Sequence, residues 1–458
     1  MMKKYSWLLI FYLLMFSNLY ATHGAGGSVT YKHISGNDYL VTISYIRDCN
    51  GIAVSIAPRN LQITNTCGFG TQTLALPLVL GPIEITEKCN AQLPTVACTS
   101  NIIGGPANTF SLFQWQDTVS LPGQCSEWYF SFSECCRSGA IVNGPANTNM
   151  HIESMLNNAQ ISENSSPVIV FHQTPILCQG QINKISLGVI ETEGDSLAFE
   201  FVSVKTSQGN NFAAYTGGYS GTSPLGGAVT IDPITGEITA TVLPFLATGS
   251  YVIAVKISDF ENGVFKGYIT YETRIAVVTC SGNQNPISPN GVINFSGTAT
   301  LDAPKIISGK PGETACFDIV FTDNTSQNLD FITNIDSIIP NATITSNTTI
   351  AGTLTINVCF TIDNTINSSI IVFKCFDDYC PFYGKTFFSI TINVENCEPN
   401  TSPLPPSGML NFSGTAQQTG LNTIQGSIGQ TTCFDIIFQD SPLDSVIILS
   451  NLSSLFPN

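Results

Sequence analysis

The stretch Val29-Thr-Tyr-Lys-His-Ile-Ser-Gly-Asn-Asp-Tyr-Leu-Val-Thr-Ile-Ser-Tyr45 decides the fold class of this chain. From Tyr39 to Tyr45, large residues alternate with smaller or polar ones, and Ser35–Asp38 supplies turn residues before them. Successive side chains of a strand point to opposite faces, so this pattern predicts a hairpin with one buried face.

The same period of two recurs along the chain. It is present in Trp128–Phe132 and in Phe388–Val394, and Asp232–Gly236 has turn composition between two short apolar runs. Helical periodicity of useful length is absent after the first 21 residues. These features predict an all-β protein made of tandem immunoglobulin- or cadherin-like β-sandwich modules behind a signal peptide.

An internal repeat organises the second half of the sequence. The segment Asn294–Ala299 returns unchanged as Asn411–Ala416, 117 positions later, and Cys316–Ile319 returns at the same offset as Cys433–Ile436. Identity that keeps one offset over several motifs indicates a tandem module.

The predicted divisions follow from this repeat and from the polar linkers. They are a signal peptide over 1–21, an N-terminal β domain over 22–165, a cadherin- or immunoglobulin-like sandwich over 166–280, a first repeat over 281–397 and an incomplete second repeat over 398–458. Half a sandwich leaves an apolar face and strand edges uncovered. We therefore expect the natural chain to continue past Asn458; the alternative is a partial, unfolded tail.

The N-terminus predicts export. Lys3 and Lys4 precede the apolar run Trp7–Phe16, and a short polar stretch leads to Ala21. Cleavage is expected near Ala21, with Ala25 as the alternative. The apolar run is too short to span a bilayer comfortably, and no other segment qualifies, so we expect no transmembrane segment in the mature chain.

Charge narrows the range of partners. Only 10% of the 458 residues are charged, and loss of Lys3 and Lys4 leaves 14 basic against 32 acidic residues, a net charge of −18. A negative field of this size repels nucleic acid and anionic membranes, so neither is an expected partner.

Fifteen cysteines in an exported chain predict disulfides. The region before the repeats, the first repeat and the second copy each hold an odd number, so at least one thiol is free or pairs across a module boundary or between chains. Cys375 and Cys380 are predicted to staple a hairpin, with a zinc site as the weaker alternative. The adjacent Cys135 and Cys136 would face opposite ways on a strand and are predicted to bond to different partners.

One group of residues could bind a cation. Glu191, Glu193 and Asp195 precede a predicted strand, and Asp259 follows another strand at what could be the same end of the module. Carboxylate oxygens from a loop and a strand end are ligands that Ca²⁺ prefers, although a solvated acidic turn has the same composition. The solvated turn is the more common arrangement, and calcium is the one candidate cofactor that this group suggests.

Catalysis finds little support. The four histidines have no metal-ligand spacing, and no nucleophile-elbow sequence is present. The aromatic residues Tyr215, Tyr219, Tyr251 and Phe260 could form a glycan-binding strip or belong to a core. We expect a protein that is not an enzyme.

Several segments resemble the N-terminal regions of large exported surface proteins of the Bacteroidota. The similarity is carried by His23–Gly27, Tyr45–Gly51, Cys135–Ile141, Gly194–Leu197 and Ile231–Gly236, with Asp377–Pro381 resembling later modules of that family. These proteins are described as gliding-motility-associated or adhesin-like and are often exported by the type IX system. The acidic segment here is Glu-Thr-Glu where aspartates are more usual, and no C-terminal sorting domain is present in this sequence.

Together these observations predict a non-catalytic protein that is secreted or held on the outer cell surface, with an adhesive or gliding-associated role. Its expected partners are an extracellular surface and a glycan or protein ligand. The alternatives are a structural surface-layer component and the accessory region of a larger polysaccharide-active enzyme.

Overall fold

A computed structural model describes residues 24–89, 98, 108–159, 163–242, 246–325, 327–348, 350–363, 368–395, 408–427, 430 and 432–436. The predicted signal peptide and most of the predicted linker after Cys397 lie outside this part of the chain. Within it, the only helix is the four-residue α2, Ile335–Ile338, and the other regular elements are strands. The all-β prediction is confirmed.

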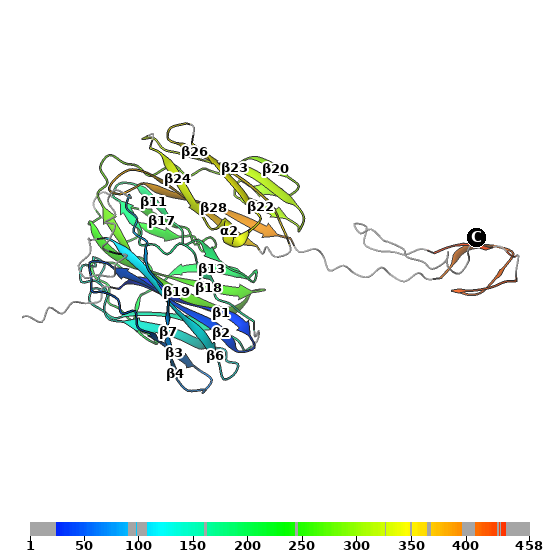
Figure 1. Cartoon of the computed structure of the whole chain (residues 1–458), viewed down its shortest axis with the longest axis horizontal. Coiled ribbons are helices and arrows are strands. Elements are labelled where there is room, and N and C mark those ends of the chain that lie inside the picture. The colour runs from blue at the N-terminus through cyan, green and yellow to red at the C-terminus, as the bar shows by residue number, and fades with distance from the viewer. Residues whose placement is uncertain are drawn as a thin grey trace, which may run out of the picture. The chain divides into compact units, whose positions relative to one another are not determined.

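A large sheet occupies the N-terminal region (Figure 1). Its main path runs β4-β3-β7-β8-β19-β1-β2-β6-β5. The predicted hairpin forms, with Tyr31 opposite Val41 in the β1–β2 register. The bounds are β1 Gly24–Ser35, β2 Asp38–Asp48, β3 Arg59–Asn65, β4 Gln72–Leu76, β5 Leu78–Glu84, β6 Phe110–Ser120, β7 Trp128–Glu134, β8 Met150–Leu156 and β19 Val264–Val278.

Strand β19 joins this sheet to the next part of the chain. It pairs with β1 and β8 and also forms a long hairpin with β18, Gly249–Glu261. Gly26 in β1 lies opposite Thr273, and a Cβ on Gly26 would lie 2.1 Å from the Glu272 carbonyl oxygen, so only glycine permits this approach.

Shorter strands complete the middle region. β13 pairs with β18, β10 runs parallel to β19, and β11, β17 and β16 form a separate three-stranded sheet. The Asp232–Gly236 turn joins β16 to β17, as the sequence predicts. The bounds are β9 Val168–Ile169, β10 Ile176–Cys178, β11 Ile182–Ile185, β12 Val189–Ile190, β13 Ser196–Phe201, β14 Lys205–Ser207, β15 Asn211–Phe212, β16 Val229–Ile231 and β17 Ile238–Thr241.

The first repeat is a two-sheet sandwich. One sheet has the order β20-β23-β26-β25 and the other β21-β22-β28-β27-β24, with a core of apolar side chains such as Phe317, Ile356 and Phe388. The bounds are β20 Ile293–Gly297, β21 Thr300–Ala303, β22 Ile306–Gly309, β23 Thr314–Thr322, β24 Leu329–Thr333, β25 Thr343–Asn347, β26 Thr353–Thr361, β27 Ser369–Asp377 and β28 Lys385–Val394.

The second copy repeats the first strands. β29 (Leu410–Gly414) pairs with β32 (Thr432–Asp435), and β30 (Gln417–Gly420) pairs with β31 (Thr423–Gln425).

The chain divides into two compact units, Met1–Glu395 and Asn396–Asn458. The predicted boundary after Cys397 lies two residues from this division. The predicted boundaries at 165/166 and 280/281 lie within the first unit, where β19 belongs to both the N-terminal sheet and the β18 hairpin.

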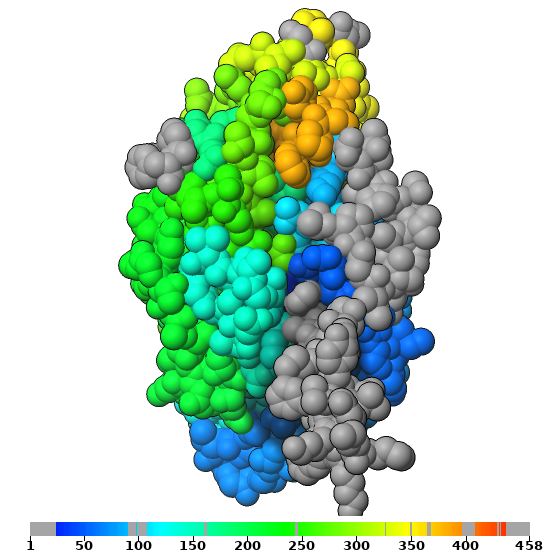
Figure 2. All heavy atoms as spheres, turned by 90° about the vertical axis from the view of Figure 1, so that its left-hand side faces the viewer, coloured from blue at the N-terminus to red at the C-terminus, as the bar shows by residue number. Residues whose placement is uncertain are grey.

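Six disulfides are present among the described cysteines. They are Cys49–Cys98, Cys67–Cys125, Cys89–Cys380, Cys135–Cys136, Cys178–Cys280 and Cys316–Cys359. Cys89–Cys380 crosses the predicted module boundaries, one of the outcomes that the odd cysteine counts allowed. Figure 2 shows orange residues of the first repeat beside blue N-terminal ones.

Two disulfide predictions are wrong. Cys375 does not bond to Cys380: its side chain is fully buried within β27 as a free thiol, whereas Cys380 lies beyond that strand with its Cα 5.4 Å from that of Cys89. Cys135 and Cys136 bond to each other across a cis peptide bond. Strand β7 ends at Glu134, so the side-chain alternation assumed for this pair does not apply to it.

Candidate cation site

The predicted acidic loop lies between β12 and β13. Glu191 is buried, and its carboxylate accepts hydrogen bonds from the backbone N–H groups of Glu193 and Asp195, at 2.9 and 2.7 Å, and of Gly194. Gly194 has a φ of +90°, a conformation that favours glycine. The Glu191 carboxylate therefore shapes the loop that carries the next two acids.

The three acids of this loop converge. Carboxylate oxygens of Glu191, Glu193 and Asp195 all lie within 4.8 Å of one another. The Glu193 carboxylate also accepts the backbone N–H of Ser165 at 2.9 Å, which ties the loop to the segment that follows β8. Three like charges this close repel one another unless a proton or a cation neutralises them.

Asp259 reaches the same end of the module from β18. The β13–β18 register places it opposite Leu197, two residues after Asp195, and its side chain is fully buried. One carboxylate oxygen, Oδ2, accepts the Asn164 side-chain N–H at 2.9 Å.

Three buried oxygens here lack a hydrogen-bond partner among the described residues. They are Oδ1 of Asp259, Oδ1 of Asn164 and Oδ2 of Asp195. A buried oxygen without a partner costs on the order of 1–3 kcal/mol, so each of these oxygens would gain from a ligand that contacts it.

The pKa values of these carboxyl groups also indicate excess negative charge at this site. Burial is the largest cause that raises the pKa of Asp259 to about 7, with the charges of Asp195 and Glu191 adding to it and the Asn164 hydrogen bond opposing it. Burial likewise raises the pKa of Glu191 and of Asp195. The positive charge of Lys266 offsets only part of the rise in the pKa of Asp195. The cluster therefore favours binding of a proton or a cation.

The sequence prediction placed four acids at one end of the module. The structure brings the carboxylates of Glu191, Glu193 and Asp195 together, whereas Asp259 lies nearby on β18, outside this group of three but within range of the charges of Asp195 and Glu191. The prediction missed Asn164, which comes from the segment after β8 and whose amide oxygen is a suitable calcium ligand. The polar run Glu163-Asn164-Ser165 is the available signal, but only the fold brings it beside Asp259.

The aromatic residues singled out in the sequence do not form an exposed strip. Tyr251 is fully buried in the core and packs edge-on against Tyr219, and the Tyr215 hydroxyl accepts the Val204 N–H. These tyrosines therefore belong to the core, which was the second of the two interpretations of the sequence.

A hollow of about 360 Å³ lies between β8, β13, β18 and β19. Its buried Glu153 accepts hydrogen bonds from Lys205 at 2.5 Å and from the Tyr268 hydroxyl at 2.6 Å. Burial would raise the pKa of Glu153, but hydrogen bonds from His151, Lys205 and Tyr268 outweigh it and lower the pKa to about 2. This carboxylate is held ionised and is poorly suited to donate a proton at neutral pH.

Comparison with known proteins gives neither a matching family model nor a matching curated protein. Among solved structures, the N-terminal Ig1-2 module of the Drosophila receptor protein tyrosine phosphatase DLAR is 14% identical, with 50% of this chain and all of that chain covered and a TM-score of 0.19. The eight N-terminal Ig domains of Down syndrome cell adhesion molecule are 8% identical, over 81% of this chain and 57% of that chain, at a TM-score of 0.18. The titin segment A168-A169 is 10% identical, over 50% of this chain and all of that chain, at a TM-score of 0.16.

The chain is thus an all-β protein with disulfides, which are typical of oxidising compartments. No helix among the described residues is long and apolar enough to cross a membrane.

Proposed function

We propose that this chain is an exported, non-catalytic surface protein of adhesion type, and that the Glu191, Glu193, Asp195, Asp259 and Asn164 site holds calcium. The observation that supports the calcium site is the group of three carboxylates whose oxygens lie within 4.8 Å of one another, with unpartnered buried oxygens on Asp195 and on the hydrogen-bonded pair Asp259 and Asn164. Calcium takes six to eight oxygen ligands at 2.3–2.6 Å in flexible geometry, which suits carboxylates and an amide from three segments.

The proposed role of calcium is to fix these segments against one another. The acidic loop, the strand end at Asp259 and the segment at Asn164 carry negative or unpaired groups that a divalent cation would neutralise. Rigid modules then display their loops, the usual location of binding residues. The disulfides are consistent with an extracellular location. We propose that the protein lies on the outer cell surface and that it binds a glycan or a protein there.

Thermal unfolding of the mature chain in EDTA and in calcium tests the site. A ligand that binds only the folded state at 100 times its Kd stabilises it by about 2.7 kcal/mol, so we expect calcium to raise the unfolding midpoint. The Asp259→Asn variant should lose most of this shift while remaining folded in EDTA, because the amide removes a buried charge.

Glu200→Gln is the matched control, since Glu200 is an exposed carboxylate on the adjacent strand β13. It should keep the wild-type calcium shift. An unchanged midpoint of the wild-type chain in calcium would exclude the site. Binding of the calcium-loaded chain to a glycan array, lost in EDTA, would support adhesion over a purely structural role.

A further inference from the structure

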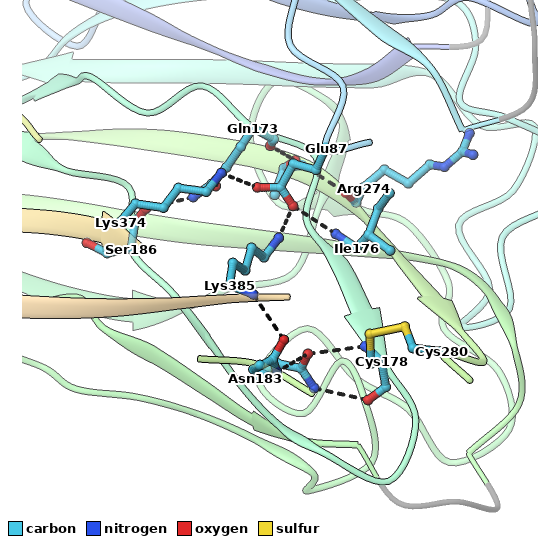
Figure 3. A network of polar contacts seen from close by, with 12 residues as sticks. Glu87, Gln173, Ile176, Cys178, Asn183, Ser186, Arg274, Cys280, Lys374 and Lys385 are labelled. Atoms are coloured by element: carbon cyan, nitrogen blue, oxygen red, sulfur yellow. Dashed lines mark hydrogen bonds and ion pairs between the residues drawn. A yellow bond between two sulfur atoms is a disulfide. The ribbon is translucent and has the colours of Figure 1, made fainter. Parts of the chain in front are cut away.

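A buried charged cluster joins two segments that are far apart in the sequence. Glu87 follows β5, whereas Lys374 lies in β27 and Lys385 at the start of β28. All three side chains are at most 7% exposed. Lys374 Nζ donates to Glu87 Oε1 at 2.6 Å, the backbone N–H of Ile176 donates to Oε2 at 3.1 Å, and Lys385 Nζ contacts Oε2 (Figure 3).

Among the residues that the structure describes, the cluster holds two amines, those of Lys374 and Lys385, and one carboxylate, that of Glu87. The segment 90–107, which follows Glu87, contains no aspartate or glutamate. Lys374 Nζ also lies 3.5 Å from the neutral side chain of Gln173, and the rings of Tyr383 and Phe387 lie within 6 Å of it. One carboxylate can offset one ammonium in so dry a place, so the second amine is favoured in its neutral form.

Lys385 is the amine favoured in the neutral form, because Lys374 already donates a hydrogen bond to the Glu87 carboxylate. Its Nζ has no partner with hydrogen-bond geometry among the described residues, although it contacts the Glu87 carboxylate. Burial lowers the pKa of Lys374 to about 7 and that of Lys385 well below its usual value. A neutral, desolvated lysine amine is a nucleophile.

Covalent and backbone contacts hold the two groups in place. The Cys89–Cys380 disulfide links positions two residues after Glu87 and five before Lys385. The Cys89 N–H also donates to the Pro381 carbonyl at 3.3 Å, and the Lys385 N–H donates to Asn285 Oδ1 at 3.1 Å. Groups fixed in contact react with effective molarities on the order of 10⁵ M or more, which favours condensation that free amines and carboxylates do not undergo.

We propose that Glu87 and Lys385 are a modification site at which the two side chains condense into an intramolecular isopeptide bond. Lys385 Nζ attacks Cδ of Glu87 while the Lys374 ammonium gives a proton to the carboxylate oxygen that it already contacts. The N–C bond forms, one C–O bond breaks, and water leaves with one proton from Lys374 and one from Lys385 Nζ. No oxidant or reductant is needed, and the buried product carries no charge, since Lys374 ends as a neutral amine.

This link would join residue 87 to residue 385 beside the disulfide and would resist reductants. It is independent of the proposed calcium site, which lies in another part of the fold.

The intact mass of the mature chain after full reduction tests the proposal. We expect the wild-type chain to be lighter than its sequence by one water molecule. Trypsin should fail to cleave after Lys385, and a branched peptide should join that residue to the segment containing Glu87. Lys385→Arg should restore the full sequence mass, because a guanidinium does not condense with the carboxylate.

Lys305→Arg, which changes another partly buried lysine of the same repeat, should keep the loss of one water. Formation of the Cys89–Cys380 disulfide in the Lys385→Arg variant, seen in a non-reduced peptide map, verifies that its fold is retained. A reduced wild-type chain with the full sequence mass would overturn the proposal, as would a branch at Lys374 in place of Lys385.

Discussion

The two copies of the repeat share their strand pairing but differ in burial. In the first copy, Ser296 lies opposite Cys316, and in the second, Ser413 lies opposite Cys433, so the register repeats at the offset of 117. Asn294 and Asn411 both have a φ of +52°.

Their apolar positions have different surroundings. Phe317 and Ile319 are fully buried, whereas Phe434 is half-buried and Ile436 is 47% exposed. In the first copy, β26 and β28 supply the cover. The described strands of the second copy are β29–β32 only. Pairing register is therefore encoded within the strands themselves, while burial depends on segments later in the repeat.

Truncation of a matched phenylalanine should give the largest difference between the copies. We expect Phe317→Ala to lower the free energy of unfolding by about 3–5 kcal/mol, because it opens a cavity between two sheets. Phe434→Ala should cost less, about 1 kcal/mol, since Phe434 is only half-buried and its neighbour Ile436 is exposed. Calorimetry on the two variants measures this, and equal losses would show that both copies have a closed core.

Removal of the matched cysteines should give the next largest difference. Cys316 bonds to Cys359, 43 residues away, and Cys433 is an exposed free thiol. We expect Cys316→Ser to cost about 2–4 kcal/mol and Cys433→Ser to be close to neutral. Urea midpoints measure both variants. A comparable loss for Cys433→Ser would mean that this thiol has a disulfide partner in the natural protein.

The sequence predicted what depends on local pattern. Side-chain alternation gave the hairpin at Val29–Tyr45, and the constant offset gave the repeat. It did not predict that β19 would close onto β1, because that contact depends on the glycines at 26 and 27 meeting a strand almost 250 residues later.

In the candidate site, too, contacts within one module were predicted and contacts with distant segments were not. Glu191 and Asp259 were predicted to meet because strand ends of one module lie together. Asn164 and the disulfide partner of Cys380 could not be predicted, because both come from segments outside the module that holds the motif.

The stability of the chain should depend on pH through Asp259, which lies in the acidic site and outside both copies of the repeat. The pKa of Asp259 is about 7 in the folded chain against an ordinary value of 3.8, so the folded state binds the proton more tightly. Without calcium, stability should therefore fall as pH rises from about 4 to about 7, by roughly 1–3 kcal/mol. Urea midpoints across this range in EDTA measure it. Asp259→Asn should flatten the profile and Glu200→Gln should not; superimposable profiles for wild type and Asp259→Asn would contradict the assignment.

The smallest effect should also be the one that the two copies share. Asn294 Nδ2 donates to Asp318 Oδ2 at 2.6 Å, and Asn411 Nδ2 donates to Asp435 Oδ2 at the same distance. Alanine tolerates the left-handed region less well than asparagine and also loses this hydrogen bond, so each Asn→Ala change should cost about 1 kcal/mol.

Asn→Gly is the control, because glycine adopts the positive φ freely and loses only the hydrogen bond. Hydrogen exchange of the β20–β23 and β29–β32 amides measures both sites separately. If only Asn294→Ala accelerates exchange, the shared register depends on the closed sandwich; if both do so equally, the strand pair forms on its own contacts and precedes burial.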